Sequence, residues 1–361
     1  MKYSIDKNSN KPAYILLYEQ LRADITGGIY PYGTKLPSKR LLAEESGVSV
    51  VTVEHTYTLL CDEGYIESRE RSGYYVIYRE GDLTSAADIN APADIVHGVR
   101  SGGEYDFPFS VLAKTMRKVL LDRGEELLIK SPNNGCPELR QAIASYLARS
   151  NGMAVKPEQV IIGSGAEYLY SLIAQLLTGR TFAIEDPSYK KIHLVYDACG
   201  VTCRMLKLGR DGIKSSELGK TDATVLHITP FNSFPSGITA SASKRAEYIR
   251  WAETRGGYIV EDNYDSEMTV STKNEEPVYA LSPDGRVIYL NTFSHTVAPS
   301  IRVVYMVLPE NLVEIFNEKL GFYSCTVPVF EQIVLAELLN SGDFERHINR
   351  VRRIRRQKKK G

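Results

Sequence analysis

Hydrophobic residues recur every three or four positions near the start of this chain. The stretch "AYILLYEQLRADI" from Ala13 has this spacing, which predicts an amphipathic helix, and "GGIYPYGTKLPS" interrupts it with glycines and prolines. Ser38 is a suitable N-cap for a second short helix, which we expect to end at Gly47. A third helix is expected from Ser49, and its buried side would carry Val53, Tyr57 and Leu60.

The pattern changes beyond Gly64, where "YIESRERSGYYVIY" alternates around Ser72 and Gly73 and predicts a two-stranded wing. Two short helices across a glycine-containing turn, followed by such a wing, indicate a winged helix-turn-helix. The alternative is a small helical domain without a role in DNA binding. Charge favours that alternative, because acidic residues outnumber basic ones over residues 13–79.

The amino-acid sequence of this segment favours a role in DNA binding. "LPSKRLLAEESGVSVVTVEHTYTLLCDEGYIESRERSGYYV" closely resembles the winged helix-turn-helix of GntR-family regulators. The resemblance implies binding of a double-stranded DNA operator. Its implied contacts come from the first turn of the second helix, the recognition helix and the wing: Ser38, Lys39, Arg40, Ser49, Val50, Thr52, His55, Arg71, Ser72 and Gly73.

One position departs from the GntR pattern. The family usually has arginine or another polar residue after the serine that opens the recognition helix, and this chain has Val50. Valine can contact the methyl group of thymine but cannot form a bidentate pair with guanine. We therefore expect an operator that depends less on guanine at that position.

After a polar segment, short apolar runs alternate with helical patterns. The runs are "QVIIGSG", "TFAIEDPSY", "VTCRMLKL", "ATVLHITP", "GYIVEDNYD", "VIYLNTFS" and "VVYMVLP". This alternation predicts an α/β fold with a mostly parallel sheet of about seven strands covered by helices, with the ligand at the carboxyl ends of the strands. We expect three parts: a winged helix-turn-helix at 1–78, a linker at 79–104 and the large domain at 105–361.

Several polar and aromatic residues follow those strand ends. Ser164, Gly165 and Ala166 open a helix in a phosphate-binding arrangement, and Tyr189 could stack on a planar cofactor. Asp262 could pair with a protonated pyridine nitrogen. The remaining candidates are Asn232, Tyr264, Thr292, Ser294, His295 and Arg302.

Each candidate alone is more often structural, but their order and spacing resemble the fold-type-I aminotransferases that use pyridoxal 5'-phosphate (PLP). The phrases "EDPSY", "VEDNYDSEM" and "TFSHTVAPSIR" belong to this pattern. Taken with the N-terminal segment, nearly the whole chain is similar to MocR-type regulators, in which a GntR-like domain precedes an aminotransferase-like domain. In that fold the active site lies at a dimer interface, so the resemblance implies a homodimer.

His295 departs from this pattern, because the group reads TFSK here and its lysine forms the Schiff base with PLP. An imidazole cannot form a stable imine, although it can exchange a proton. We expect PLP to bind without a covalent link or not at all, and a preformed PLP–amine adduct to bind better. Lys190 and Lys191 are expected to face solvent.

The other departures lie in the loop around Asn232 and at the chain end. The group commonly has S-H-Q-F-P where this chain has "FNSFP". Relatives continue from the basic segment "HINRVRRIRRQKKKG" into a small domain whose arginine binds the ligand carboxylate, and we expect that domain to be missing. The basic run itself could contact DNA or be a solvated helix end.

Composition limits the classes of protein that remain possible. The formal net charge is zero, no run of residues could span a bilayer, and the five cysteines fit neither a redox pair nor a metal site. We expect a cytoplasmic protein without a metal. Three functions stay open: a regulator that dimerises and senses a small amine or amino acid, a PLP-dependent aminotransferase with an accessory DNA-binding domain, and a degenerate relative without a ligand response.

Overall fold

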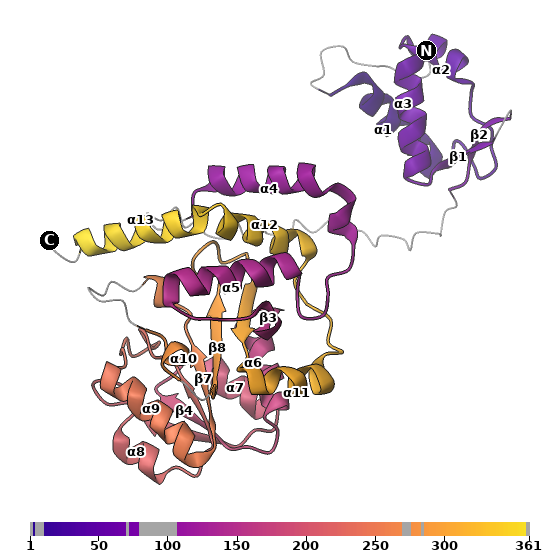
Figure 1. The fold of residues 1–361 in the computed structure, drawn as a ribbon. Coiled ribbons are helices and arrows are strands. Elements are labelled where there is room, and N and C mark those ends of the chain that lie inside the picture. Colours follow the sequence, from indigo (N-terminus) through magenta and orange to yellow (C-terminus); the bar gives the residue numbers. More distant parts are fainter. Residues whose placement is uncertain are drawn as a thin grey trace. The chain divides into compact units, whose positions relative to one another are not determined.

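The computed structural model describes residues 3, 11–69, 72–78, 107–268, 276–282 and 285–358. They belong to two compact units, Met1–Gly98 and Val99–Gly361, each of which is considered by itself (Figure 1). The expected linker at 79–104 and the predicted DNA contact Arg71 lie outside the described residues.

The N-terminal unit has three helices and a two-stranded wing. Their bounds are α1 Ala13–Thr26, α2 Lys39–Ser46, α3 Val50–Asp62, β1 Ile66–Arg69 and β2 Gly73–Val76, with β1 antiparallel to β2. The Ser38 and Ser49 side chains cap α2 and α3 by accepting hydrogen bonds from backbone N–H groups, and Gly47 ends α2 in the left-handed conformation with φ of 66°. The helices, caps and wing predicted from the sequence are confirmed.

Packing of this unit follows the predicted helical spacing. Val53, Tyr57 and Leu60 from α3 are fully buried against Leu17 and Leu21 of α1 in one apolar cluster. That face of α3 therefore packs in the core, whereas Glu54, His55 and Thr58 on the same helix are exposed to solvent.

The large unit is built on a seven-stranded sheet, and every strand run predicted from the sequence is present. The bounds are β3 Val160–Ser164, β4 Phe182–Asp186, β5 Cys203–Lys207, β6 Val225–Ile228, β7 Tyr258–Asp262, β8 Val287–Thr292 and β9 Val303–Val307. The spatial order is β3-β9-β8-β7-β6-β4-β5, and β9 is antiparallel to both of its neighbours while the other pairs are parallel. A mostly parallel sheet is confirmed.

Helices cover both faces of this sheet (Figure 1). Their bounds are α4 Phe109–Arg123, α5 Pro137–Asn151, α6 Ala166–Leu176, α7 Lys190–Ala198, α8 Ser215–Lys220, α9 Ala242–Arg255, α10 Val278–Leu281, α11 Glu310–Leu320, α12 Val329–Asn340 and α13 Asp343–Lys358, with short 3-10 turns η1 Gly124–Leu128, η2 Pro157–Gln159 and η3 Ser266–Met268. Successive residues of β3 pack into different hydrophobic clusters. Val160 and Ile162 pack with α5 and α12, whereas Ile161 packs with α6 and α11.

None of the helices in the described ranges is both long and apolar enough to cross a membrane. Within those same ranges no group of three or more histidine, cysteine or acidic side chains is arranged to hold a metal ion.

Candidate functional site

A pocket of about 310 Å³ opens beside the ends of β7 and β8 and the start of α6. This volume is at the lower end of what small-molecule sites have. Its lining is Gly165, Ala166, Glu167, Tyr170, Tyr189, Lys191, Ile192, Thr229, Phe234, Asp262, Tyr264, Leu290, Asn291, Thr292, Ser294, Arg302 and Val304. The position at the carboxyl ends of parallel strands is the one predicted from the topology.

Asp262 lies at the end of β7 and is 7% exposed. The Tyr170 hydroxyl donates a hydrogen bond to its carboxylate, and His227 Nε2 lies 3.9 Å from the same oxygen. Burial and the negative charge of Asp262 together raise the pKa of Tyr170 well above its usual value, so this hydroxyl remains a donor. The pocket therefore has a buried carboxylate held in one orientation.

Aromatic rings form the walls above Asp262. Tyr189 and Phe234 meet edge to face with ring centroids 6.4 Å apart, and Tyr264 donates a hydrogen bond of 2.8 Å to the Asn232 carbonyl oxygen. Asn232 has φ of 52°, a left-handed conformation that asparagine tolerates better than most residues. The pocket therefore combines aromatic surface, on which a planar ring can stack, with the Asp262 carboxylate.

The opposite end of the pocket carries charges of both signs. Gly165 precedes α6 with φ of 91°, and a Cβ atom there would lie 2.4 Å from the Arg302 guanidinium. Arg302 lies 3.2 Å from the Glu167 carboxylate, and Lys191 Nζ lies 2.6 Å from it. The hydrogen bond from Lys191 lowers the pKa of Glu167, which is therefore ionised at neutral pH.

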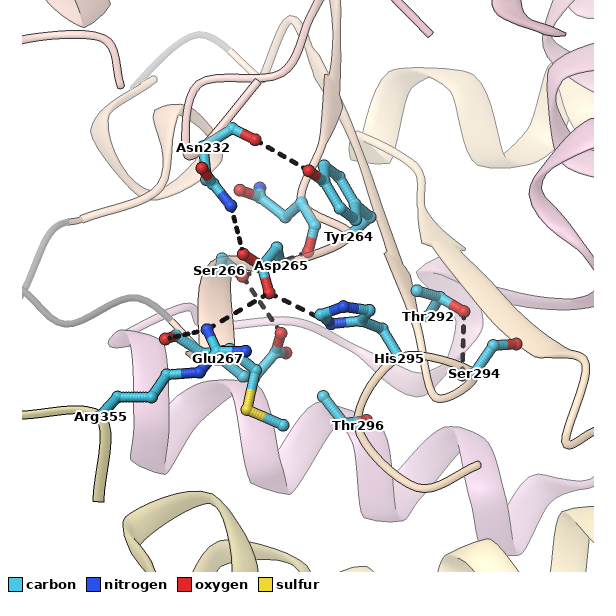
Figure 2. Close-up of polar contacts among 12 residues, drawn as sticks. Asn232, Tyr264, Asp265, Ser266, Glu267, Thr292, Ser294, His295, Thr296 and Arg355 are labelled. Atoms are coloured by element: carbon cyan, nitrogen blue, oxygen red, sulfur yellow. Dashed lines mark hydrogen bonds and ion pairs between the residues drawn. The ribbon is translucent and has the colours of Figure 1, made fainter. Parts of the chain in front are cut away.

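The His295 ring points toward Asp265 and away from Thr292 and Ser294 (Figure 2). Its Nδ1 lies 3.1 Å from Asp265 Oδ1, and its ring meets Tyr264 edge to face with centroids 5.9 Å apart. Asp265 also accepts a 2.6 Å hydrogen bond from Asn232 Nδ2 and has Arg355 at 3.9 Å. Burial raises the pKa of Asp265, but these partners, His295 first, outweigh it and hold the pKa below its usual value.

The structure gathers most of the residues singled out from the sequence. Eight of the eleven line the pocket: Gly165, Ala166, Tyr189, Asp262, Tyr264, Thr292, Ser294 and Arg302. The other three lie next to it: Ser164 donates its backbone N–H to Thr326, Asn232 belongs to the adjoining loop, and His295 pairs with Asp265.

Sequence reasoning missed Glu167 and Tyr170, and it placed Lys191 in solvent. The Lys191 side chain is exposed, as expected, but it also bonds Glu167 and lines the pocket, which the sequence did not indicate. Glu167 and Tyr170 lie one and four positions beyond Ala166, so helical spacing from the glycine turn could have found both.

The predicted DNA contacts lie on the surface of the N-terminal unit. Ser38, Arg40, Ser49, Val50 and His55 are exposed, while Lys39, Thr52, Ser72 and Gly73 are partly buried. Lys39 Nζ already lies 2.5 Å from Glu54, so a phosphate would have to compete with that carboxylate for it.

The basic segment near the chain end forms α13, which is not simply a solvated end. Arg352 Nε donates a 2.6 Å hydrogen bond to the Glu267 carbonyl oxygen, and Arg355 donates one of 2.9 Å to the Met268 carbonyl oxygen. These two arginines hold η3, which follows Asp265, whereas Arg353 and Arg356 are exposed.

A winged helix-turn-helix in one chain with an aminotransferase-like α/β fold defines a class: DNA-binding regulators whose second domain has the fold of an enzyme. Comparison with known families and proteins agrees with this class. Residues 101–360 match the family described as aminotransferase class I and II, and residues 14–76 match that of bacterial regulatory proteins of the gntR family.

Individual relatives give the same result. The chain is 32% identical to the uncharacterised HTH-type transcriptional regulator YdeL of Bacillus subtilis, over 98% of this chain and 79% of that protein. It is 30% identical to the probable rhizopine catabolism regulatory protein MocR of Rhizobium meliloti, over 99% and 77% of the two chains. The chain therefore belongs to the MocR-type regulators of the GntR family, which are DNA-binding transcriptional regulators.

Solved aminotransferases share the fold of the large unit. The α-aminoadipate aminotransferase LysN of Thermus thermophilus, solved in complex with N-(5'-phosphopyridoxyl)-L-leucine, has a TM-score of 0.62 and 27% identity over 70% of this chain. The match spans 65% of that enzyme's chain, slightly less than two thirds. PLP is thus plausible from the fold.

Proposed function

We propose that this protein is a homodimeric, cytoplasmic transcriptional regulator whose aminotransferase-like domain dimerises and holds PLP or a PLP–amine adduct only without a covalent bond. The observation that carries the proposal is His295: an imidazole stands where the resemblance implies the lysine, and it is bonded to Asp265. An amino acid or another small amine would then act as effector through its adduct.

The pocket is lined by residues that could hold both the ring and the phosphate of PLP. Asp262 would pair with the pyridine nitrogen, Tyr189 would stack on the ring and Tyr264 would face a ring substituent. Arg302, Thr292, Ser294 and the turn at Gly165 would hold the phosphate. When bound, PLP would supply an electron sink for amines, but His295 offers no amine for its covalent attachment.

A working aminotransferase is the second candidate, because the ring-binding residues are present. Among the described lining residues the only amine is Lys191, which is held by Glu167 at the charged end. This arrangement supports a binding site rather than a transaminase.

The dimer is supported by an apolar surface at the start of the large unit. Leu121 of α4 and Leu128 of η1 are each 85% exposed, and Ile129 is 67% exposed. Exposed aliphatic residues grouped on adjoining elements are typical of a protein interface.

Reduction with borohydride tests the mode of PLP binding. We expect PLP to leave the wild-type protein on dialysis, and mass spectrometry after reduction to show no pyridoxyl group on the site. His295→Lys should gain such a group and serves as the positive control. A pyridoxyl group found in the pocket of the wild-type protein would overturn the non-covalent assignment.

Gel-shift binding to the DNA upstream of the gene tests the regulatory function. The full chain should bind with an affinity that falls as salt rises, and PLP with an amino acid should change that affinity. If no combination of PLP and amine changes the DNA affinity, the protein is a DNA binder without a ligand response. Amino-group transfer from a panel of amino acids would identify the enzyme instead.

A further inference from the structure

The anion-binding end of the pocket already contains an anion, the Glu167 carboxylate. It receives Arg302 at 3.2 Å and Lys191 at 2.6 Å, so both cations at this end are engaged by one acidic side chain. Glu167 Oε2 also lies 3.1 Å from where a Gly165 Cβ atom would be, directly at the turn that opens α6. The carboxylate thus lies among the groups that a ligand phosphate would need.

The Ser294 hydroxyl and the Ser294 backbone N–H at this end both donate hydrogen bonds within the protein. Thr292 Oγ1 accepts the Ser294 backbone N–H at 3.1 Å, and Ser294 Oγ donates to the Ile301 carbonyl oxygen at 2.6 Å. A phosphate that binds Arg302 and the Ser294 hydroxyl would have to break the internal contacts of both groups.

We propose that Glu167 is a specificity-determining residue that acts as a built-in counter-anion and disfavours ligands with a dianionic phosphate at this end of the pocket. The inference rests on the proposed function, because it concerns the same cofactor pocket. A phosphate ester displaces Glu167 from Arg302 and is then repelled by a carboxylate that Lys191 alone retains. A ligand without a phosphate leaves the three side chains in place.

Calorimetry with the full chain tests this proposal by comparing two ligands on three proteins. Pyridoxine and pyridoxine 5'-phosphate differ by the phosphate and carry no aldehyde that could react with surface lysines. The ratio of their dissociation constants is measured for the wild type and for Glu167→Gln. The matched control is Glu310→Gln: Glu310 also lies in the first turn of a helix and pairs with a lysine, Lys156, at 2.9 Å.

In Glu167→Gln the preference for the phosphorylated molecule should rise about tenfold, whereas Glu310→Gln should keep the wild-type ratio. An unchanged ratio in Glu167→Gln, with both molecules binding, would overturn this proposal and leave the proposed function intact. An equal rise in the control would also overturn it, because net charge would then be the cause. If neither molecule binds to any of the three proteins, the proposal and the ligand-binding part of the proposed function both fail, while DNA binding is judged separately.

Discussion

At the scale of single residues, burial sets the pKa of the Glu185 carboxyl group, whereas charged partners set those of Asp265 and Glu167. Glu185 on β4 is 3% exposed and accepts a 2.6 Å hydrogen bond from Ser233. Burial raises the pKa of Glu185 from its usual 4.5 to about 7, and that hydrogen bond only partly offsets it. The folded protein therefore holds a proton here more tightly than the unfolded chain does.

This gives a prediction about pH and stability. A raised folded-state pKa contributes stability that is fully present below pH 4.5 and is lost as the pH rises through about 7. From pH 5.5 to pH 8 the contribution of Glu185 to the free energy of unfolding should fall by about 2 kcal/mol. Glu185→Gln should remove this part of the slope in urea unfolding, and Glu126→Gln, at an exposed surface position, should not. Parallel curves for wild type and Glu185→Gln would contradict the assignment.

At the scale of elements, α13 connects the end of the chain to the site. Arg352 and Arg355 bond the backbone of η3, and η3 directly follows the Asp265 that pairs with His295. The amino-acid pattern identified the basic run but could not separate arginines that dock from arginines that stay in water, because that choice depends on which surface the helix packs against.

We predict that Arg352→Ala lowers the free energy of unfolding by about 1–2 kcal/mol, because it leaves the partly buried Glu267 carbonyl oxygen without its charged donor. Arg353→Ala removes an exposed arginine from the same helix and should cost less than about 0.5 kcal/mol. Chemical denaturation of both variants measures the difference. Equal losses would show that the docking contact does not stabilise η3.

At the scale of the whole molecule, the expected assembly depends on the apolar surface of α4 and η1. We predict that the double substitution Leu121→Asp and Leu128→Asp converts a dimer into a monomer at micromolar concentration. Loss of the second winged helix should then weaken binding to a DNA with two half-sites at least about tenfold. Sedimentation velocity and gel shift measure the two effects.

The control for this prediction is Ile315→Asp on α11, which replaces another exposed aliphatic residue with aspartate. It should leave both the sedimentation coefficient and the DNA affinity unchanged. A double variant that still sediments as a dimer would place the subunit interface on another surface.

Much of this architecture was determined by the sequence itself. Alternating and three-to-four spacing decides which face of an element is apolar, so the winged helix-turn-helix and all seven strands could be read from the chain. Residues at strand ends, such as Asp262, could also be grouped from the sequence, because the carboxyl ends of parallel strands meet at one edge of the sheet.

The tertiary structure determined which residue each polar side chain pairs with through hydrogen bonds and ion pairs. The pairing of His295 with Asp265, the capture of Arg302 and Lys191 by Glu167, and the docking of Arg352 all join residues far apart in the chain or on separate elements. Periodicity carries no information about such partners, because it records only which side chains avoid water. Contacts between polar groups depend on distances that exist only after the sheet and its helices have packed.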